Sequence, residues 1–127
     1  MVMEVDRIDV VKNAFREKAA LLVDASTFID TFTDEYTGNK TNLSIITPNE
    51  GKKLRVREVI IVTDASSGVV KLDFASSNIK VARLYCSKEN TLQTTNLHLV
   101  GAVDEPLSLT TTTGDEEVFI IVNYIQE

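Results

Sequence analysis

His98 and Cys86 are the first side chains in this sequence that could carry chemistry. Each is the sole residue of its type among 127. A catalytic or metal-bound histidine needs partners, and no H-x-H, H-E-x-x-H or G-x-S-x-G pattern supplies them. A nucleophilic cysteine needs a neighbouring base. We therefore interpret His98 as an ordinary histidine at a polar strand position and Cys86 as a small packed thiol. We predict no catalytic residue, cofactor or metal.

Carboxylates form two clusters, one at Asp30, Asp34 and Glu35 and the other over residues 104–105 and 115–117. Clustered loop carboxylates can bind calcium, but the spacing of an EF-hand or nonapeptide repeat is absent. A glycosidase would need two acids that converge in a cleft. The favoured interpretation is solvated loop acids that keep strand edges from pairing, and calcium binding stays open.

Charge and composition narrow the class of protein. The net charge is −6, whereas a general nucleic-acid binder or a protein that docks on anionic lipid needs a basic surface. No apolar run approaches the roughly 18 residues that span a bilayer, and the acidic N-terminus is unlike a secretory signal. A single cysteine excludes an intrachain disulfide and suits synthesis in a reducing cytoplasm. The short basic patch over residues 52–57 is expected to pair with acids across a strand or at a subunit contact.

A long β-hairpin is predicted over Gly51–Phe74, because alternate side chains of a strand point to opposite faces. One parity of its first strand is apolar, at Leu54, Val56, Ile60 and Val62. Residues 64–68 supply turn chemistry, and Val69–Phe74 returns as the partner strand. Glu58 interrupts the apolar parity. It is either a buried, hydrogen-bonded carboxylate or the site of a β-bulge that shifts the register.

The opposite face of the same strand also becomes apolar, at Val59 and Ile61. The last predicted strand, residues 117–125, shows the same property through Phe119 and Ile121. A strand that is apolar on both faces is covered on both sides. The cover could be a second sheet, a helix or a neighbouring subunit.

The remaining predicted strands are short and are separated by turn signals every 8–12 residues. They span residues 19–24, 26–33, 43–47, 79–86, 94–100 and 107–113, with a polar loop at 88–93. Such a series predicts an all-β, antiparallel β-sandwich or barrel. Threonine is a good strand former, so the run over residues 110–113 is interpreted as an exposed strand.

The N-terminal residues 1–18 are predicted to be an appendage to a single β-sandwich domain over residues 19–127. Apolar residues recur there at helical spacing, at Ile8, Val11, Phe15, Ala19 and Leu22. This pattern fits a short amphipathic helix. A loosely ordered arm that docks on a neighbour is the alternative.

Several segments carry a family resemblance. They are Gly51–Val56, Val70–Phe74, Glu105–Thr112 and Val118–Tyr124, and Phe32–Asn39 fits the same resemblance. Together they resemble the small, jelly-roll-like β-sandwich proteins found among the structural genes of tailed bacteriophages and prophages, over about residues 24–127. The resemblance implies a non-enzymatic virion component made in the host cytoplasm, of the head-decoration, head-fibre or tail-accessory type.

The same resemblance implies assembly as a homo-oligomer, with a trimer favoured, together with other virion proteins and with no nucleic acid or membrane. A ring of subunits would bury the second faces of the strands. The predicted interface residues are Val59, Ile61, Phe119 and Ile121.

Two other classes of protein compete with this interpretation. A carbohydrate- or ligand-binding β-sandwich would need an aromatic platform or groove, and the sequence offers only Tyr36, Tyr85 and Tyr124 with no tryptophan. A small hydrolase or isomerase on a jelly-roll barrel would need a histidine and carboxylate cluster. One histidine excludes a multi-histidine metal site within a single chain.

Overall fold

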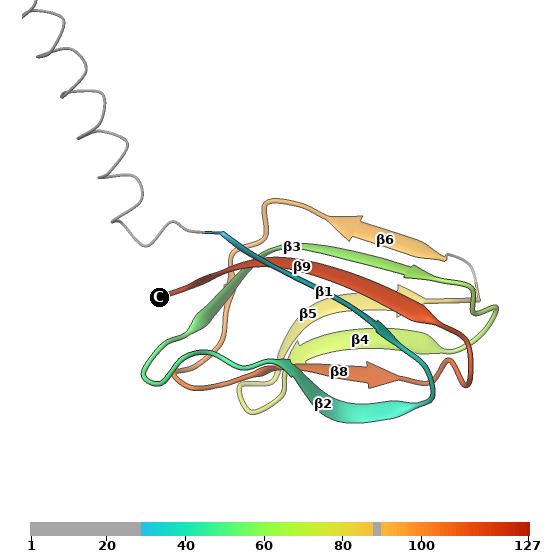
Figure 1. Cartoon of the computed structure of the whole chain (residues 1–127), viewed down its shortest axis with the longest axis horizontal. Coiled ribbons are helices and arrows are strands. Elements are labelled where there is room, and N and C mark those ends of the chain that lie inside the picture. Colours follow the sequence, from blue (N-terminus) through green and yellow to red (C-terminus); the bar gives the residue numbers. More distant parts are fainter. Residues whose placement is uncertain (1–28, 88–89) are drawn as a thin grey trace, which may run out of the picture.

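A computed structural model of the chain describes residues 29–87 and 90–127, which form nine strands in two antiparallel sheets (Figure 1). Sheet A contains, in order, β1 (Asp30–Tyr36), β9 (Val118–Gln126), β3 (Leu54–Thr63) and β6 (Thr91–Thr94), and the short β7 (Leu99–Val100) also pairs with β3. Sheet B contains β2 (Lys40–Ile46), β8 (Leu107–Thr111), β4 (Val69–Phe74) and β5 (Ile79–Tyr85). The predicted appendage of residues 1–18 and the predicted strand 19–24 lie outside the described residues.

The predicted all-β, antiparallel β-sandwich is confirmed, and its strand order is that of a jelly roll. Four nested pairs each join a strand from the first half of the chain, β1 to β4, to one from the second half: β1 with β9, β2 with β8, β3 with β6 and β4 with β5. The chain is thus one long hairpin whose tip is the β4–β5 turn. Rolling it up places β1, β3, β6, β7 and β9 in sheet A and β2, β4, β5 and β8 in sheet B.

The predicted hairpin of β3 with β4 is wrong. β3 pairs only within sheet A and β4 only within sheet B, so residues 64–68 cross from one sheet to the other. Ala65 is buried in this crossing, and Gly68 has a φ of 96° and lies against the backbone of Thr112. Turn chemistry marks where a strand ends, but it does not decide which strand becomes its partner.

The inward sides of the two sheets form one apolar core. Its largest fully buried side chains include Leu54 and Ile61 from sheet A and Leu72, Phe74 and Leu109 from sheet B. Burying each such side chain contributes about 1.5–3 kcal/mol. Cys86 belongs to the same core as a free thiol, as predicted.

A β-bulge in β3 decides which side chains enter this core. The register with β9 shifts between Val56 and Glu58, so Arg57 is the extra residue. This settles the alternatives left open for Glu58 in favour of the bulge. Because a strand alternates with period two, one extra residue reverses every later side chain. Val59 and Ile61 therefore point inward and are completely buried beneath sheet B.

The region before β8 also differs from the prediction. β6 covers Thr91–Thr94, where a polar loop was expected, and the predicted strand 94–100 is reduced to the two residues of β7. β6 is an edge strand that pairs with one end of β3 only, and its polar composition gives little signal. His98 is exposed in the β6–β7 connection instead of lying within a strand.

The threonine run is not the exposed strand that was predicted, because Thr111 and Thr113 are buried. Three of its hydroxyl groups accept backbone N–H groups from neighbouring segments. Thr110 accepts from Asn42 at 3.1 Å, Thr111 from Lys40 at 3.0 Å and Thr112 from Val69 at 2.9 Å. The run therefore attaches β2 and the start of β4 to β8.

Glu105 is a buried carboxylate, in contrast to the solvated loop acid that was predicted. It accepts hydrogen bonds from the Ser77 N–H at 2.7 Å, the Ser77 hydroxyl at 2.6 Å and the Ala102 N–H at 2.9 Å. Burial acts to raise the pKa of Glu105, but hydrogen bonds to the ionised form outweigh it and hold the pKa below its ordinary value. Glu105 thereby fixes the β4–β5 turn against the β7–β8 connection.

Replacing Glu105 with glutamine should destabilise the fold at about pH 7 by roughly 1–3 kcal/mol, because an amide offers one acceptor oxygen to three donors. The native pKa is lowered, so the carboxylate stabilises the fold above its unfolded pKa near 4.3. That contribution is lost as the pH falls through the native pKa. Urea denaturation at about pH 7 and about pH 3 measures this, with the exposed Asp115→Asn as control. An equal loss of stability at both pH values would contradict the assignment.

Candidate interaction surface

Four apolar side chains form a block at the centre of the outward side of sheet A. Ile60 lies directly opposite Ile121, and Val62 lies directly opposite Phe119. Val62 is 40% exposed and the other three are partly exposed. We call Ile60, Val62, Phe119 and Ile121 the outer block.

Polar side chains frame the outer block. The strand registers place Thr33 and Glu35 of β1 on one side, Thr91 and Gln93 of β6 on the other, and Glu58 and Asn123 beyond Ile60 and Ile121. The Thr31 hydroxyl donates a hydrogen bond to the Asn123 side chain at 2.7 Å. An apolar centre with a polar rim is the usual anatomy of a protein–protein interface.

The outward side of sheet B has a different character. Its central positions on β4 and β5 carry Lys71, Asp73 and Arg83, and Asp73 and Arg83 form an ion pair. Thr110 of β8 lies opposite Lys71. The two faces of the sandwich are therefore unlike at their centres, which are apolar on sheet A and charged on sheet B.

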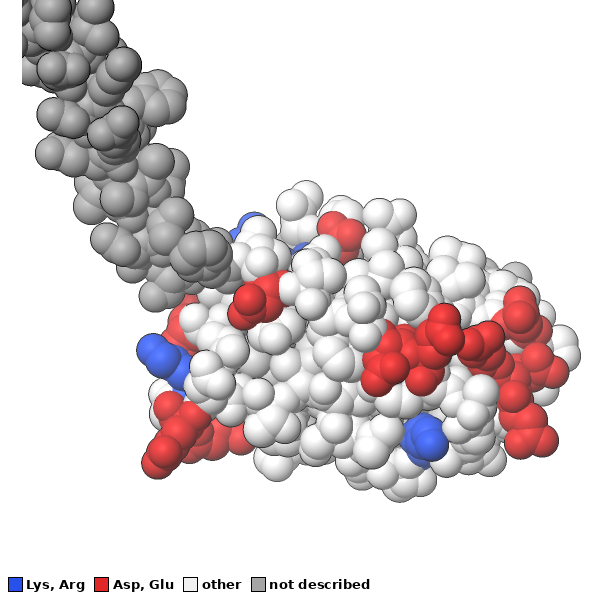
Figure 2. All heavy atoms as spheres, in the orientation of Figure 1, with Lys and Arg blue, Asp and Glu red and all other residues white. Residues whose placement is uncertain are grey.

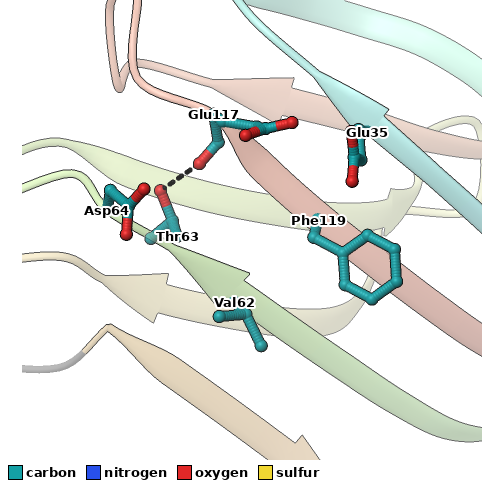
Figure 3. Close-up of a pocket in the computed structure, with 6 residues that line it drawn as sticks. All are labelled: Glu35, Val62, Thr63, Asp64, Glu117 and Phe119. Atoms are coloured by element: carbon teal, nitrogen blue, oxygen red, sulfur yellow. Dashed lines mark hydrogen bonds between the residues drawn. The ribbon is translucent and has the colours of Figure 1, made fainter.

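A shallow hollow of about 110 Å³ lies at one end of the outer block, beside Val62 and Phe119 (Figure 3). Its other lining residues are Glu35, Thr63, Asp64 and Glu117. The Thr63 hydroxyl donates a hydrogen bond to the Glu117 carbonyl oxygen at 2.8 Å, which joins the end of β3 to the start of β9. Figure 2 shows acidic side chains gathered at the end of the molecule where β3 leads into its crossing to β4.

The pKa of Glu117 is raised by a hydrogen bond with the Glu35 side chain and by repulsion from its charge, with smaller contributions from burial and from Asp64. Two carboxyl groups that hydrogen-bond to one another share a proton more readily than both ionise. Between residues 29 and 127, apart from 88–89, no group of three or more His, Cys, Asp or Glu is placed to hold a metal ion. The hollow is also well below the roughly 300–1,000 Å³ of typical ligand pockets. It is better described as the acidic rim of a surface.

The structure separates the four predicted interface residues. Phe119 and Ile121 lie in the outer block, whereas Val59 and Ile61 are fully buried within the sandwich and have no surface to offer a partner. The outward positions on β3 are occupied by Ile60 and Val62, which share the parity of the buried Leu54 and Val56 in the sequence. Glu58, which interrupts that parity, is the sequence signal for the bulge that separates the two pairs. The interface itself stays a prediction.

The other candidate residues are dispersed. Cys86 is buried, and its burial raises the pKa of the thiol, which makes it a poorer nucleophile. Tyr36 and Tyr124 pack against the core, and burial together with Asp34 raises the pKa of Tyr36 to about 12. Tyr85 is 61% exposed on edge strand β5. The tyrosines therefore do not converge into an aromatic platform.

The basic patch behaves partly as expected. Arg55 forms an ion pair with the Glu127 carboxylate at 2.7 Å. This pair joins β3 to the residue that follows β9, beside the backbone hydrogen bonds between Lys53 and Glu127. Its role is local attachment of two strands of sheet A.

Comparison with known proteins gives a likeness of fold. No protein-family model matches the chain, and no curated protein matches it in sequence. The chain is similar to a chain in the acid-stable capsid structure of Helicobacter pylori bacteriophage KHP30, with a TM-score of 0.59 and 10% sequence identity. The match covers 79% of this chain and 89% of that chain. It shows that the β-sandwich fold is shared with a chain of a phage capsid.

Replacing Glu117 with glutamine should raise the melting temperature slightly at about pH 7, because it removes one of two facing carboxylates. The native pKa of Glu117 is raised, so the stability gained from proton sharing is present below the unfolded pKa near 4.3 and is lost as the pH rises through the native pKa. The advantage of the variant should therefore disappear at about pH 4. Thermal melts at both pH values test this, with Glu116→Gln as the control. A benefit that is the same at both pH values would rule out the shared proton.

Proposed function

We propose that the chain is a structural component of a bacteriophage virion and works by assembly, not by catalysis. The observation that carries the proposal is the jelly-roll strand order, together with its likeness to a chain of a phage capsid. The family resemblance of residues 24–127 supports the same class. The partners would be other copies of the chain and other virion proteins, and the site of action would be the virion.

Within the virion we favour a protein on the capsid, of the decoration or head-fibre type, over a tail accessory. The structural neighbour comes from a capsid, which supports this order. The outer block supports assembly through sheet A, since it places apolar side chains inside a polar rim. A homo-oligomer, with a trimer favoured, would bury Phe119 and Ile121 as the sequence predicted, with Ile60 and Val62 beside them.

A carbohydrate- or ligand-binding module is the second candidate. The hollow beside Phe119 is the feature that could support it. Its small volume and three carboxylates suit a neutral sugar poorly, because protein sites for small ligands enclose most of the ligand surface. Assembly through the outer block accounts for more of the structure.

Replacing Val62 with aspartate should weaken self-association at least about tenfold, because a charge would be buried at the centre of the interface. Light scattering over a range of protein concentrations measures the mass of the full chain and of the variant. Tyr85→Asp is the matched control. Tyr85, like Val62, is a large hydrophobic residue exposed on a strand, but it lies on sheet B. Circular dichroism verifies that both variants fold. A parent chain that stays monomeric at high concentration would refute assembly, and a Val62→Asp variant with the parent's mass would refute this interface.

A further inference from the structure

We infer that the outer block of one copy binds one end of the sandwich of a second copy, where Val103 lies beside Lys52 and Lys53. The inference rests on the proposed self-assembly and names the second surface of the contact. A ring of identical copies joins two unlike surfaces of each chain. A trimer that assembles through the outer block therefore needs a different surface of the next copy. We call Val103, Lys52 and Lys53 the knob.

The charges around the outer block disfavour a second outer block as its occupant. Glu58 lies at one end of the block, and Glu35, Asp64 and Glu117 lie at the other. Stacking two blocks face to face therefore brings carboxylates together in either orientation of the strands. Arg57, next to Glu58, is half-buried with its Nε enclosed, which limits its use as a counter-charge. Like charges brought together at an interface oppose association.

The knob is the exposed apolar site whose surroundings suit this acidic rim. Four large apolar side chains are exposed outside the block in the part of the chain that the structure describes; they are Ile29, Leu43, Tyr85 and Val103. Ile29 precedes Asp30 and would add another acid, and Leu43 has uncharged neighbours in the sequence. Tyr85 lies on sheet B, and a contact between opposite sides of a sandwich repeats as an open stack instead of a ring. Val103 lies beside two exposed lysines.

Backbone hydrogen bonds hold the knob in place. The Asp104 N–H donates to the Lys52 carbonyl oxygen at 2.8 Å, and the Asp104 carboxylate accepts the Gly51 N–H at 2.7 Å. On the other side of Val103, the Ala102 N–H donates to the buried carboxylate of Glu105. Val103 is nevertheless 51% exposed. A surface that is already fixed before it binds loses little conformational freedom on binding.

The hollow beside the outer block matches the knob in chemistry. One wall is apolar, formed by Val62 and Phe119, and the others carry three carboxylates. Val103 can pack against the apolar wall, while the stems of Lys52 and Lys53 lie along it and their ammonium groups reach the carboxylates. Apolar surface then meets apolar surface, and positive charge meets negative charge.

The distance between the two surfaces requires a second copy. The knob lies at the end of the sandwich where β3 begins, and the hollow lies where β3 ends (Figure 1). β3 has ten residues, so these ends are roughly 30 Å apart. That separation is far beyond the reach of a side chain, and the knob cannot fill the hollow of its own chain.

Charge reversal tests the inference. The full chain with Lys52→Glu and Lys53→Glu should self-associate at least about tenfold more weakly in light scattering, because like charges then face each other. Adding Glu35→Lys and Glu117→Lys to that variant should restore most of the association. The matched control is Lys71→Glu with Lys80→Glu, which reverses two lysines on sheet B and should leave association unchanged. Circular dichroism verifies that each variant folds.

Glu50 is an exposed acid on the same turn as the lysines and opposes the contact. Glu50→Gln should therefore strengthen association. An equal loss in the sheet B control, or no recovery in the fourfold variant, overturns the inference. An oligomeric parent that is insensitive to reversal of Lys52 and Lys53 contradicts the inference alone, whereas a monomeric parent contradicts self-assembly too.

Disulfide trapping gives an independent test. Full-length Val103→Cys and Val62→Cys variants, both with Cys86→Ala, should form a mixed disulfide-linked dimer on mild oxidation. Tyr85→Cys in place of Val103→Cys should cross-link roughly tenfold less, since a disulfide requires closely spaced Cα atoms. Dimers of Val62→Cys with itself, in place of the mixed dimer, would show that two outer blocks meet and would overturn the inference.

Discussion

The insertion of Arg57 into β3 is the constraint on which the rest of the structure depends. β3 pairs with β9, β6 and β7, so the orientation of its side chains sets the two sides of sheet A. One extra residue reverses the alternation after Val56. The reversal places Val59 and Ile61 in the core and turns Ile60 and Val62 outward. The same bulge that completes the core therefore also creates the outer block.

The long-range strand pairing of the jelly roll explains why several polar side chains outside the outer block are buried. Most strands pair with partners that are distant in sequence, and such pairing must be fixed at the connections as well as along the strands. Glu105 holds the tip of the hairpin through Ser77, and the threonine run fixes β2 and β4 to β8. A buried carboxylate is tolerated there because its acceptor sites are satisfied by hydrogen bonds.

Local patterns in the sequence were sufficient for the class of fold and for several strand limits. Alternation gave the end of β3 and the extent of β4 to the residue, and the extent of β9 to within one residue, because each alternates apolar and polar or is apolar throughout. The pairing of β3 with β4 could not follow from the same signal, since a strand's partner depends on the whole chain. β6 escaped prediction because an edge strand needs few apolar residues. Of the four predicted interface residues, Phe119 and Ile121 on β9 lie on the outward face, whereas Val59 and Ile61 on β3 are buried because a single bulge reverses the strand.

Comparison within sheet A shows that strand formation alone does not account for the outer block. Threonine forms strands about as well as isoleucine or valine, and it occupies outward positions at Thr33 of β1 and Thr91 of β6, in the same cross-strand rows as the block. The neighbouring positions Ile60 and Val62 could have been threonine at little cost to the sheet. Exposed apolar side chains do not stabilise an isolated domain, because their surface stays in water. Their benefit is realised only when another surface removes them from water. The proposed assembly through sheet A would give the outer block a physical reason to be apolar.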